Sequence, residues 1–194
     1  MAGLITMNGT ANGKGTRTTV LLLTLLCVFV VNTVEAVGAA YKPRQLMAIM
    51  ITKFPRYATW PTGGNGPNGK MVLCLATKDR SLKAELEGML KGKDYGGHKW
   101  EVKTVSSLRD AQGYPLVFVG KDMKEPDDAW YQTIRKQGVL TFGEKSGGKR
   151  SSVINFVIVK KKVKFDLNLD SAEKAGLKIN SRLADVAREV IGKP

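Results

Sequence analysis

Histidine, cysteine and aromatic residues are scarce in this 194-residue sequence, which has one His, two Cys and 7% aromatic residues. A histidine metal site, or a Ser-His or Cys-His catalytic pair, would therefore depend on His98 alone. His98 lies in the polar segment 95–99, with no other histidine and no acidic cluster near it in sequence. We interpret it as an exposed loop residue rather than a ligand or a pH switch. The sequence predicts no metal site and no cofactor.

Complete catalytic and nucleotide-binding motifs are also absent. Adjacent carboxylates such as Asp127 and Asp128 point their side chains apart, so they do not form an acid-base dyad. Residues 64–70 and 143–149 have the G-x-x-x-x-G-K spacing of a phosphate-binding loop. The next residue is Met or Arg, however, where that motif needs Ser or Thr, and neither segment joins a predicted strand to a predicted helix. These absences favour a protein that is not an enzyme.

The sequence has no hydrophobic run long enough for a conventional transmembrane helix. Its longest run, residues 20–31, has only Thr24 as a polar residue and follows the basic residues Lys14 and Arg17. A run of this length falls short of the about 20 residues that span a bilayer and is typical of a signal peptide, with an uncleaved signal anchor as the alternative. We expect the mature protein in the periplasm, without stable membrane insertion. The expected organisation is a signal peptide over residues 1–36, cleavage between 36 and 40, and one domain over 41–194 with a flexible glycine-rich loop at 62–70.

Acidic residues are few beside basic ones, with 17 Asp and Glu against 31 Lys and Arg and a formal net charge of +14. Loss of residues 1–36 would leave +13, so the charge belongs to the mature domain. Such a charge favours acidic surfaces, nucleic acid or anionic headgroups as neighbours. The most basic segment, residues 160–164, lies at a predicted hairpin tip, and the nearby Phe156 and Phe165 fall on apolar strand faces. Since nucleic-acid binding needs stacking aromatics among the basic residues, we expect no nucleic-acid partner.

Only Cys74 remains once the predicted signal peptide is removed. It lies in the apolar run 71–76, and a lone cysteine cannot form an intramolecular disulfide. The sequence therefore predicts a buried and unreactive thiol.

Strands and helices are expected to alternate through most of the domain. Short apolar or alternating segments predict strands at residues 71–76, 100–105, 115–120 and 138–142. Helical spacing predicts helices over residues 46–57, 81–92 and 106–111, and another from 127 onward. The first of these should end or kink at Pro55, and Ser81 is the expected N-cap of the second. This alternation predicts parallel strands joined by right-handed crossovers.

The pattern changes in the last third, where strands at residues 153–159 and 163–169 are separated by only three lysines. Such a short link makes them an antiparallel hairpin, and the almost wholly apolar first strand should lie deep in the sheet. Two helices should close the chain, one capped at Asp170 and stopped by Gly176, the other with an amphipathic stripe over residues 183–191. The expected fold class is α/β: a three-layer Rossmann-like domain with a mostly parallel central sheet, a C-terminal antiparallel hairpin and two closing helices.

Two segments carry motifs that are similar to those of a known family. Residues 54–61 are FPRYATWP, and residues 154–183 contain I-N-F, then V-x-F-x-L-N, then A-G-L-x-I-N-S-x-L. Together they resemble the YfiR family of periplasmic regulatory proteins, and the resemblance extends over residues 41–191. Tyr114 stands where many members have a second cysteine, so a disulfide switch does not carry over. The signature positions, which we interpret as structural, are Phe54, Tyr57, Trp60, Pro61, Asn155, Phe165, Asn168, Gly176, Leu177 and Ser181.

The resemblance implies a non-enzymatic periplasmic regulator. In its better-known members the family represses a membrane-bound diguanylate cyclase by binding the periplasmic domain of that enzyme, and a homodimer is compatible with this role. A periplasmic small-ligand sensor is the alternative function, because open α/β sheets bind ligands at the carboxyl ends of their strands. The residues expected at that edge are Thr77, Lys78, Gly120, Lys121 and Gly143.

Overall fold

The computed structural model describes residues 41–61, 70–92, 94–95, 97–124, 126–144 and 151–193. The expected signal peptide, almost all of the glycine-rich loop and most of both phosphate-loop-like segments lie outside these residues. Residues Tyr41–Pro194 form one unit by themselves.

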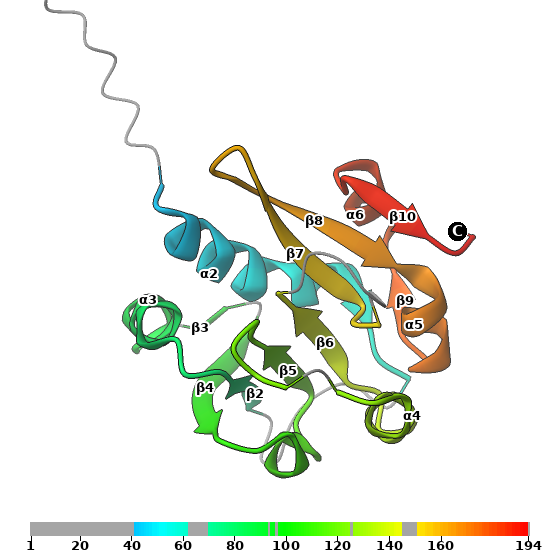
Figure 1. Ribbon diagram of the computed structural model, residues 1–194, viewed down its shortest axis with the longest axis horizontal. Helices are drawn as coiled ribbons and strands as arrows, with labels where there is room; N and C mark the ends of the chain where they lie inside the picture. Colours follow the sequence, from blue (N-terminus) through cyan, green and yellow to red (C-terminus); the bar gives the residue numbers. More distant parts are fainter. Residues whose placement is uncertain are drawn as a thin grey trace, which may run out of the picture. The chain divides into compact units, whose positions relative to one another are not determined.

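A mixed sheet forms the centre of this unit (Figure 1). Among the described residues it has eight strands in the order β10-β8-β7-β6-β5-β2-β4-β3. Their bounds are β2 Met71–Ala76, β3 Asp94–Tyr95, β4 His98–Val105, β5 Leu116–Val119, β6 Leu140–Gly143, β7 Ile154–Val159, β8 Lys162–Asn168 and β10 Glu189–Ile191. Neighbouring described strands are parallel, except that β7–β8 and β3–β4 are antiparallel. The expected mostly parallel sheet with a late antiparallel hairpin is confirmed.

The order in which the chain visits the central strands creates a switch point. After β2 the chain forms β4 on one side, and then crosses to the other side of β2 to form β5 and β6. The loops that follow β2 and β5 therefore leave the sheet side by side in opposite directions. Open α/β sheets hold their ligands outside the carboxyl ends of the strands at such a point.

Helices cover both faces of the sheet, as Figure 1 shows. Helices α2 (Pro43–Lys53) and α3 (Arg80–Leu90) pack their buried side chains on one face, with the larger core beneath them. The 3-10 helix η4 (Leu108–Ala111) and helix α4 (Asp128–Lys136) pack on the other face against a smaller core around Cys74. Because both faces are covered, the strands β2, β5 and β6 are buried along their whole length. The three-layer α/β architecture is confirmed.

A second, two-stranded sheet is formed by β1 (Ala58–Thr59) and β9 (Lys178–Ile179), and the short helices η2 (Phe54–Tyr57) and α5 (Leu169–Lys174) lead into these strands. The 3-10 helix η2 continues α2 from the point where Pro55 cannot extend an α-helix, as expected. It leads into β1, which pairs antiparallel with β9. Helix α5 ends before Gly176, whose φ of +68° is the left-handed conformation that closes many helices.

Two predicted helix caps are wrong by two residues. Helix α3 is capped by Asp79, whose carboxylate accepts hydrogen bonds from the backbone amides of Ser81 and Leu82. Helix α5 is capped by Asn168 rather than Asp170, through a 2.8 Å bond from the Ser171 amide to Asn168 Oδ1. In each case the side chain two residues upstream accepts from the first free amides of the helix.

The predicted last helix is largely wrong. Helix α6 covers only Ser181–Asp185, and the chain then extends into β10, which lies parallel to β8. Of the expected apolar stripe, Leu183 is buried whereas Val186 is 68% exposed. The extended chain places Arg188 against the fully buried carboxylate of Asp166, and this ion pair replaces the helix that local spacing predicts.

The hairpin and His98 also differ from expectation. The turn between β7 and β8 has two residues rather than three, since Val159 pairs with Lys162. Only the first half of β7 lies deep in the sheet, because Ile158 and Val159 are exposed. His98 begins β4 and is half-buried, so it is a strand residue rather than an exposed loop residue. Every helix in the described ranges is too short or too polar to cross a lipid bilayer.

Candidate functional site

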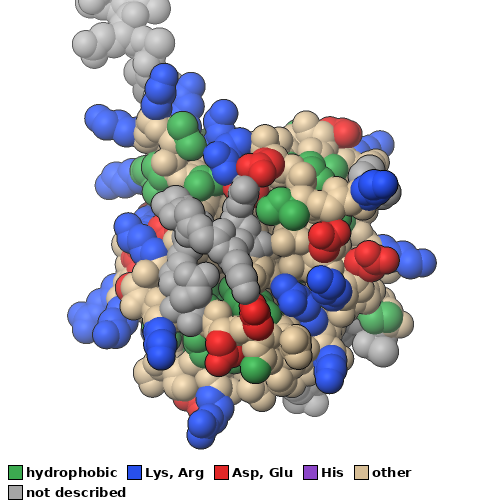
Figure 2. Space-filling view, turned by 45° about the vertical axis from the view of Figure 1, so that its right-hand side comes forward, with side chains coloured by type: hydrophobic (Ala, Val, Ile, Leu, Met, Phe, Trp, Pro, Cys, Tyr) green, Lys and Arg blue, Asp and Glu red, His purple; other side chains and the backbone are tan. Residues whose placement is uncertain are grey.

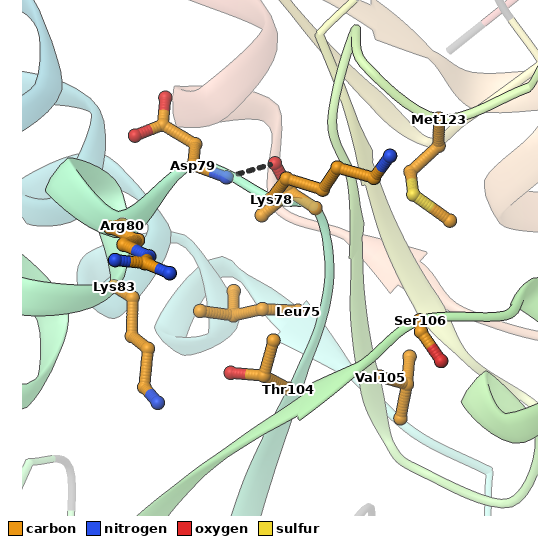
Figure 3. A pocket seen from close by; sticks show the side chains of 10 residues that line it. Leu75, Lys78, Asp79, Arg80, Lys83, Thr104, Val105, Ser106 and Met123 are labelled. Atoms are coloured by element: carbon orange, nitrogen blue, oxygen red, sulfur yellow. Dashed lines mark hydrogen bonds between the residues drawn. The ribbon is translucent and has the colours of Figure 1, made fainter.

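A pocket of about 570 Å³ lies at the carboxyl ends of β2 and β4, beside the first turn of α3 (Figure 3). Its size is within the range of pockets that bind small molecules. Three side chains, Leu75, Val105 and Met123, give it apolar contact surface. Three hydroxyl groups, from Thr77, Thr104 and Ser106, provide hydrogen-bond donors and acceptors. Lys78, Asp79, Arg80 and Lys83 supply the charged groups of the lining.

The loop after β2 is held by Asp122, which follows β5. The Thr77 hydroxyl donates a 2.6 Å hydrogen bond to Asp122 Oδ1, and the Lys78 amide donates a 2.5 Å bond to Asp122 Oδ2. Thr77 Oγ1 also accepts from the Asp79 amide at 3.1 Å, the bond drawn in Figure 3. These bonds join the two loops that diverge at the switch point, so the pocket wall is fixed before any ligand arrives.

Electrostatics and close packing both act on this junction. Burial alone would raise the pKa of Asp122, but the Thr77 hydroxyl, the backbone amides of Lys78 and Asp122 and the charge of Lys78 together lower it. Gly120 crosses so close to Thr77 and Asp122 that an added Cβ would overlap both side chains. Glycine is therefore needed at this crossing.

Cationic side chains dominate the charge of the pocket. Figure 3 shows Lys78 extending toward Met123, with Arg80 and Lys83 together on the side of α3. Lys83 Nζ also lies 3.7 Å from Glu87 Oε1, and this exposed ion pair contributes little to the stability of the fold. The backbone amides at the start of α3 are already used by Asp79, so binding of an anion would rest on these side chains rather than on the helix terminus.

The single carboxylate of the lining is neutralised by Arg44 from the first turn of α2. Arg44 Nη2 lies 2.7 Å from Asp79 Oδ2, and Arg44 Nη1 lies 2.6 Å from Glu144 Oε1. Glu144, directly after β6, is 7% exposed. Arg44 thus connects α2, the start of α3 and the end of β6, and leaves Asp79 little free charge to repel an acidic ligand.

The expected ligand edge is divided in the structure. Thr77 and Lys78 line the pocket. Gly120 packs closely against the Thr77 side chain but does not line the pocket. Lys121 is exposed beside this loop and is not part of the lining. Gly143 lies at the end of β6, where an added Cβ would meet Ser152 and Asn155 instead.

The contributions of α3 and β4 to the pocket were not predicted from the sequence. Arg80 and Lys83 occupy an ordinary polar helical face, and only the tertiary structure places them over a hollow. Thr104 and Ser106 could have been recognised from the sequence, because they are small polar residues at the end of the predicted strand 100–105. Thr77 likewise comes directly after the predicted strand 71–76. The strand 100–105 lies on the other side of β2, away from the predicted edge.

Several family-signature side chains have packing contacts. The Phe54 ring lies 4.7 Å from the Phe165 ring and stacks on Phe156 at 6.2 Å between centroids. Leu177 is buried in the same core, and Gly176 approaches the Pro61 ring so closely that an added Cβ would lie 3.3 Å from it.

Other signature residues act through hydrogen bonds or lie at the margin of the core. Asn155 Nδ2 donates to the Ser152 carbonyl at 2.7 Å, and Asn168 caps α5. Ser181 is the first residue of α6. Tyr57 is 37% exposed, while Trp60 packs on the core with its indole nitrogen unpaired among the described residues.

Cys74 is fully buried at the centre of the smaller core, as expected. Burial raises the pKa of its thiol to about 12, with a further contribution from the charge of Asp110 and an opposing one from Lys103. At neutral pH the group is a thiol, which is a poor nucleophile and a poor metal ligand. Within the described ranges no three His, Cys, Asp or Glu side chains are grouped to hold a metal ion.

The sequence matches the profile of the YfiR/HmsC-like family over residues 44–188. No curated protein matches the chain. Among solved structures, a conserved domain protein from Vibrio cholerae O1 biovar El Tor is similar, with 11% identity and a TM-score of 0.47. The ABC domain in complex with L-Trp from Streptococcus pneumonia is also similar, with 12% identity and a TM-score of 0.46. Both alignments cover 77% of this chain, which spans 60% of either structure, and neither carries an argument about function.

Proposed function

Because this chain belongs to the YfiR/HmsC-like family, we propose that it binds the periplasmic domain of a membrane-bound signalling enzyme and represses that enzyme. The family is one of periplasmic regulators of cyclic-di-GMP signalling, so the proposed target is a diguanylate cyclase. The observation that carries the proposal is the extent of the match, which runs from α2 to the residue before β10. Protein–protein contact without catalysis is the proposed mode of action.

Export is part of this proposal. We propose that residues 1–36, which lie outside the described part of the chain, act as a cleaved signal peptide. The regulator would then meet its target on the periplasmic side of the membrane.

The charge of the domain supports a role for electrostatic steering. Figure 2 shows Lys and Arg side chains projecting around the outline of one face, with Asp and Glu side chains between them. On this face the basic residues are not confined to one patch, and the net charge of +13 on the mature domain would speed encounter with an acidic partner at long range. The Debye length falls from about 30 Å at 0.01 M salt to about 8 Å at 0.15 M, so steering should weaken over that interval.

The test is capture of the target from native membranes with the mature domain, residues 41–194, as bait. The proposal predicts recovery of a membrane signalling enzyme and a slower association at 0.15 M salt than at 0.01 M salt. Recovery of no membrane protein at either salt concentration would contradict it.

A second candidate function, a periplasmic small-ligand sensor, is favoured by the pocket at the carboxyl ends of β2 and β4. Its three cations and three hydroxyls suit an acidic small molecule, and its apolar side chains suit an organic body attached to the acidic group. Phenyl phosphate combines both features and can be titrated into the mature domain by calorimetry.

The matched pair of variants is Lys78→Gln/Arg80→Gln inside the pocket and Lys91→Gln/Lys99→Gln outside it. Both remove two positive charges, so a general effect of net charge would weaken binding equally. Pocket binding predicts a loss of about tenfold or more in the first variant only. Equal loss in both variants, or no heat of binding, would dismiss the sensor function.

A further inference from the structure

The β7–β8 hairpin extends past its neighbours in the sheet. Strand β6 pairs with β7 only as far as Asn155, and β10 pairs with β8 only from Asp166 onward. Within the part of the chain that the structure describes, residues 156–165 therefore pair only with one another. Figure 1 shows the end of the hairpin standing clear of the other strands. Its base is anchored, because Phe165 packs on Phe54 of η2.

The far end of this hairpin, residues 158–164, is called the hairpin tip. Ile158 and Val159 are large apolar side chains that are 47% and 37% exposed. The four lysines of the tip are exposed beside them: Lys160, Lys161, Lys162 and Lys164. None of these lysines forms an ion pair with an acidic side chain of the described residues, and the nearest acidic residue on β8, Asp166, is bound to Arg188.

The turn itself is strained. Lys160 and Lys161 have φ values of 48° and 65°, and of the described residues they alone have positive φ without being glycine. Two positive φ values in a two-residue hairpin loop define a type I′ turn, in which Asn and Gly are strongly preferred. Lysine at both positions costs conformational energy that Asn-Gly would avoid. The turn conformation therefore does not favour lysine at these two positions, which is consistent with a role for the positive charge at the tip.

We propose that the hairpin tip is the surface through which this protein contacts its target, and that the target presents an acidic surface that also offers apolar contacts. This inference rests on the regulatory function proposed above. Ile158 and Val159 would supply apolar contacts on opposite faces of the hairpin, since neighbouring strand residues point to opposite sides, and the lysines would pair with carboxylates of the target. Two copies of this chain would not pair tip to tip, because that contact would bring eight lysines together.

The decisive variant is Lys160→Asn/Lys161→Gly, since it removes two charges and also relieves the turn. If the tip has only a structural role, this change should leave the protein equally or more stable and its function intact. If the tip binds the target, the change should weaken that binding. The control is Lys91→Gln/Lys99→Gln, which removes the same charge near β3 and β4, at the other end of the strand order. Each gene is returned to a deletion strain to measure repression, and the melting temperature of each purified protein is measured. A photo-crosslinking amino acid at position 158 reports contact with the target.

The proposal predicts that Lys160→Asn/Lys161→Gly melts at or above the wild-type temperature. It also predicts that the crosslink from position 158 to the membrane enzyme falls about tenfold, with loss of repression, while the control behaves as wild type. Full repression by the turn variant would overturn the role of the tip and leave the regulatory function standing. Crosslinks from position 158 to phospholipid instead of protein would also overturn it. Absence of repression by the wild-type gene would remove the regulatory function and this inference together.

Discussion

Replacing Arg188 with alanine should detach the last strand and destabilise the domain. Arg188 lies just before β10 and donates to Asp166 through Nε at 2.6 Å and through Nη2 at 2.5 Å. Its own backbone amide donates to the Phe165 carbonyl at 2.8 Å. The Asp166 side chain is 0% exposed, so without Arg188 a buried carboxylate loses its charged partner.

The size of the effect follows from the burial of the two partners. Removing one member of a buried ion pair costs about 3–5 kcal/mol, because the other charge stays desolvated. The Arg188 side chain is 36% exposed, and water can reach the vacated space, so we expect a loss of about 3 kcal/mol. Replacing both partners, as Asp166→Leu/Arg188→Met, leaves no unpaired charge and should cost much less.

Urea denaturation measures the free energy of unfolding, and hydrogen exchange locates the change. In Arg188→Ala, amides of β10 and of its neighbour β8 should exchange faster, while those of β2 and β5 keep their relative protection. A loss below about 1 kcal/mol, or a double variant as unstable as the single one, would refute the reasoning that the ion pair holds β10.

Four further predictions concern Cys74, Gly120 and the start of the mature chain. The Cys74 thiol, whose pKa is raised to about 12, should react with a bulky thiol reagent only when the protein unfolds, and fast labelling of the native protein at pH 8 would contradict its burial. Since the thiol of the unfolded chain ionises with its ordinary pKa of 9.0, the stability of the fold should be retained below pH 9 and decline as the pH rises toward 12. Gly120→Ala should cost about 1–3 kcal/mol in urea denaturation, because the new methyl group overlaps Thr77, and an unchanged stability would exclude that overlap. Amino-terminal sequencing should place the start of the exported protein within residues 37–41, and a start at Met1 would rule out cleavage.

The central fold follows from local pattern, whereas the end of the chain does not. The strands β2 and β5 are short apolar segments bounded by polar residues, and such segments are recognisable without tertiary information. The last segment has helical spacing of apolar residues, yet a carboxylate 22 residues upstream determines its conformation. A pair of charges so far apart leaves no periodic signal, so sequence pattern alone predicts a helix there.

The same distinction applies to the pocket and the hairpin tip. Thr77 and Lys78 could be placed at the ligand edge because they directly follow a predicted strand. Arg80 and Lys83 could not, since their position over the pocket depends on how α3 packs. The lysines of the tip were visible as a basic hairpin turn, but their left-handed backbone depends on a turn one residue shorter than the sequence suggested.

The regulatory function is tested most directly by the cellular level of cyclic-di-GMP. It is measured in the parent strain, in a strain lacking this gene and in the deletion strain carrying the wild-type gene. Repression of a diguanylate cyclase predicts that the level rises on deletion and returns to the parental value on complementation. An unchanged level in the deletion strain would contradict the proposal.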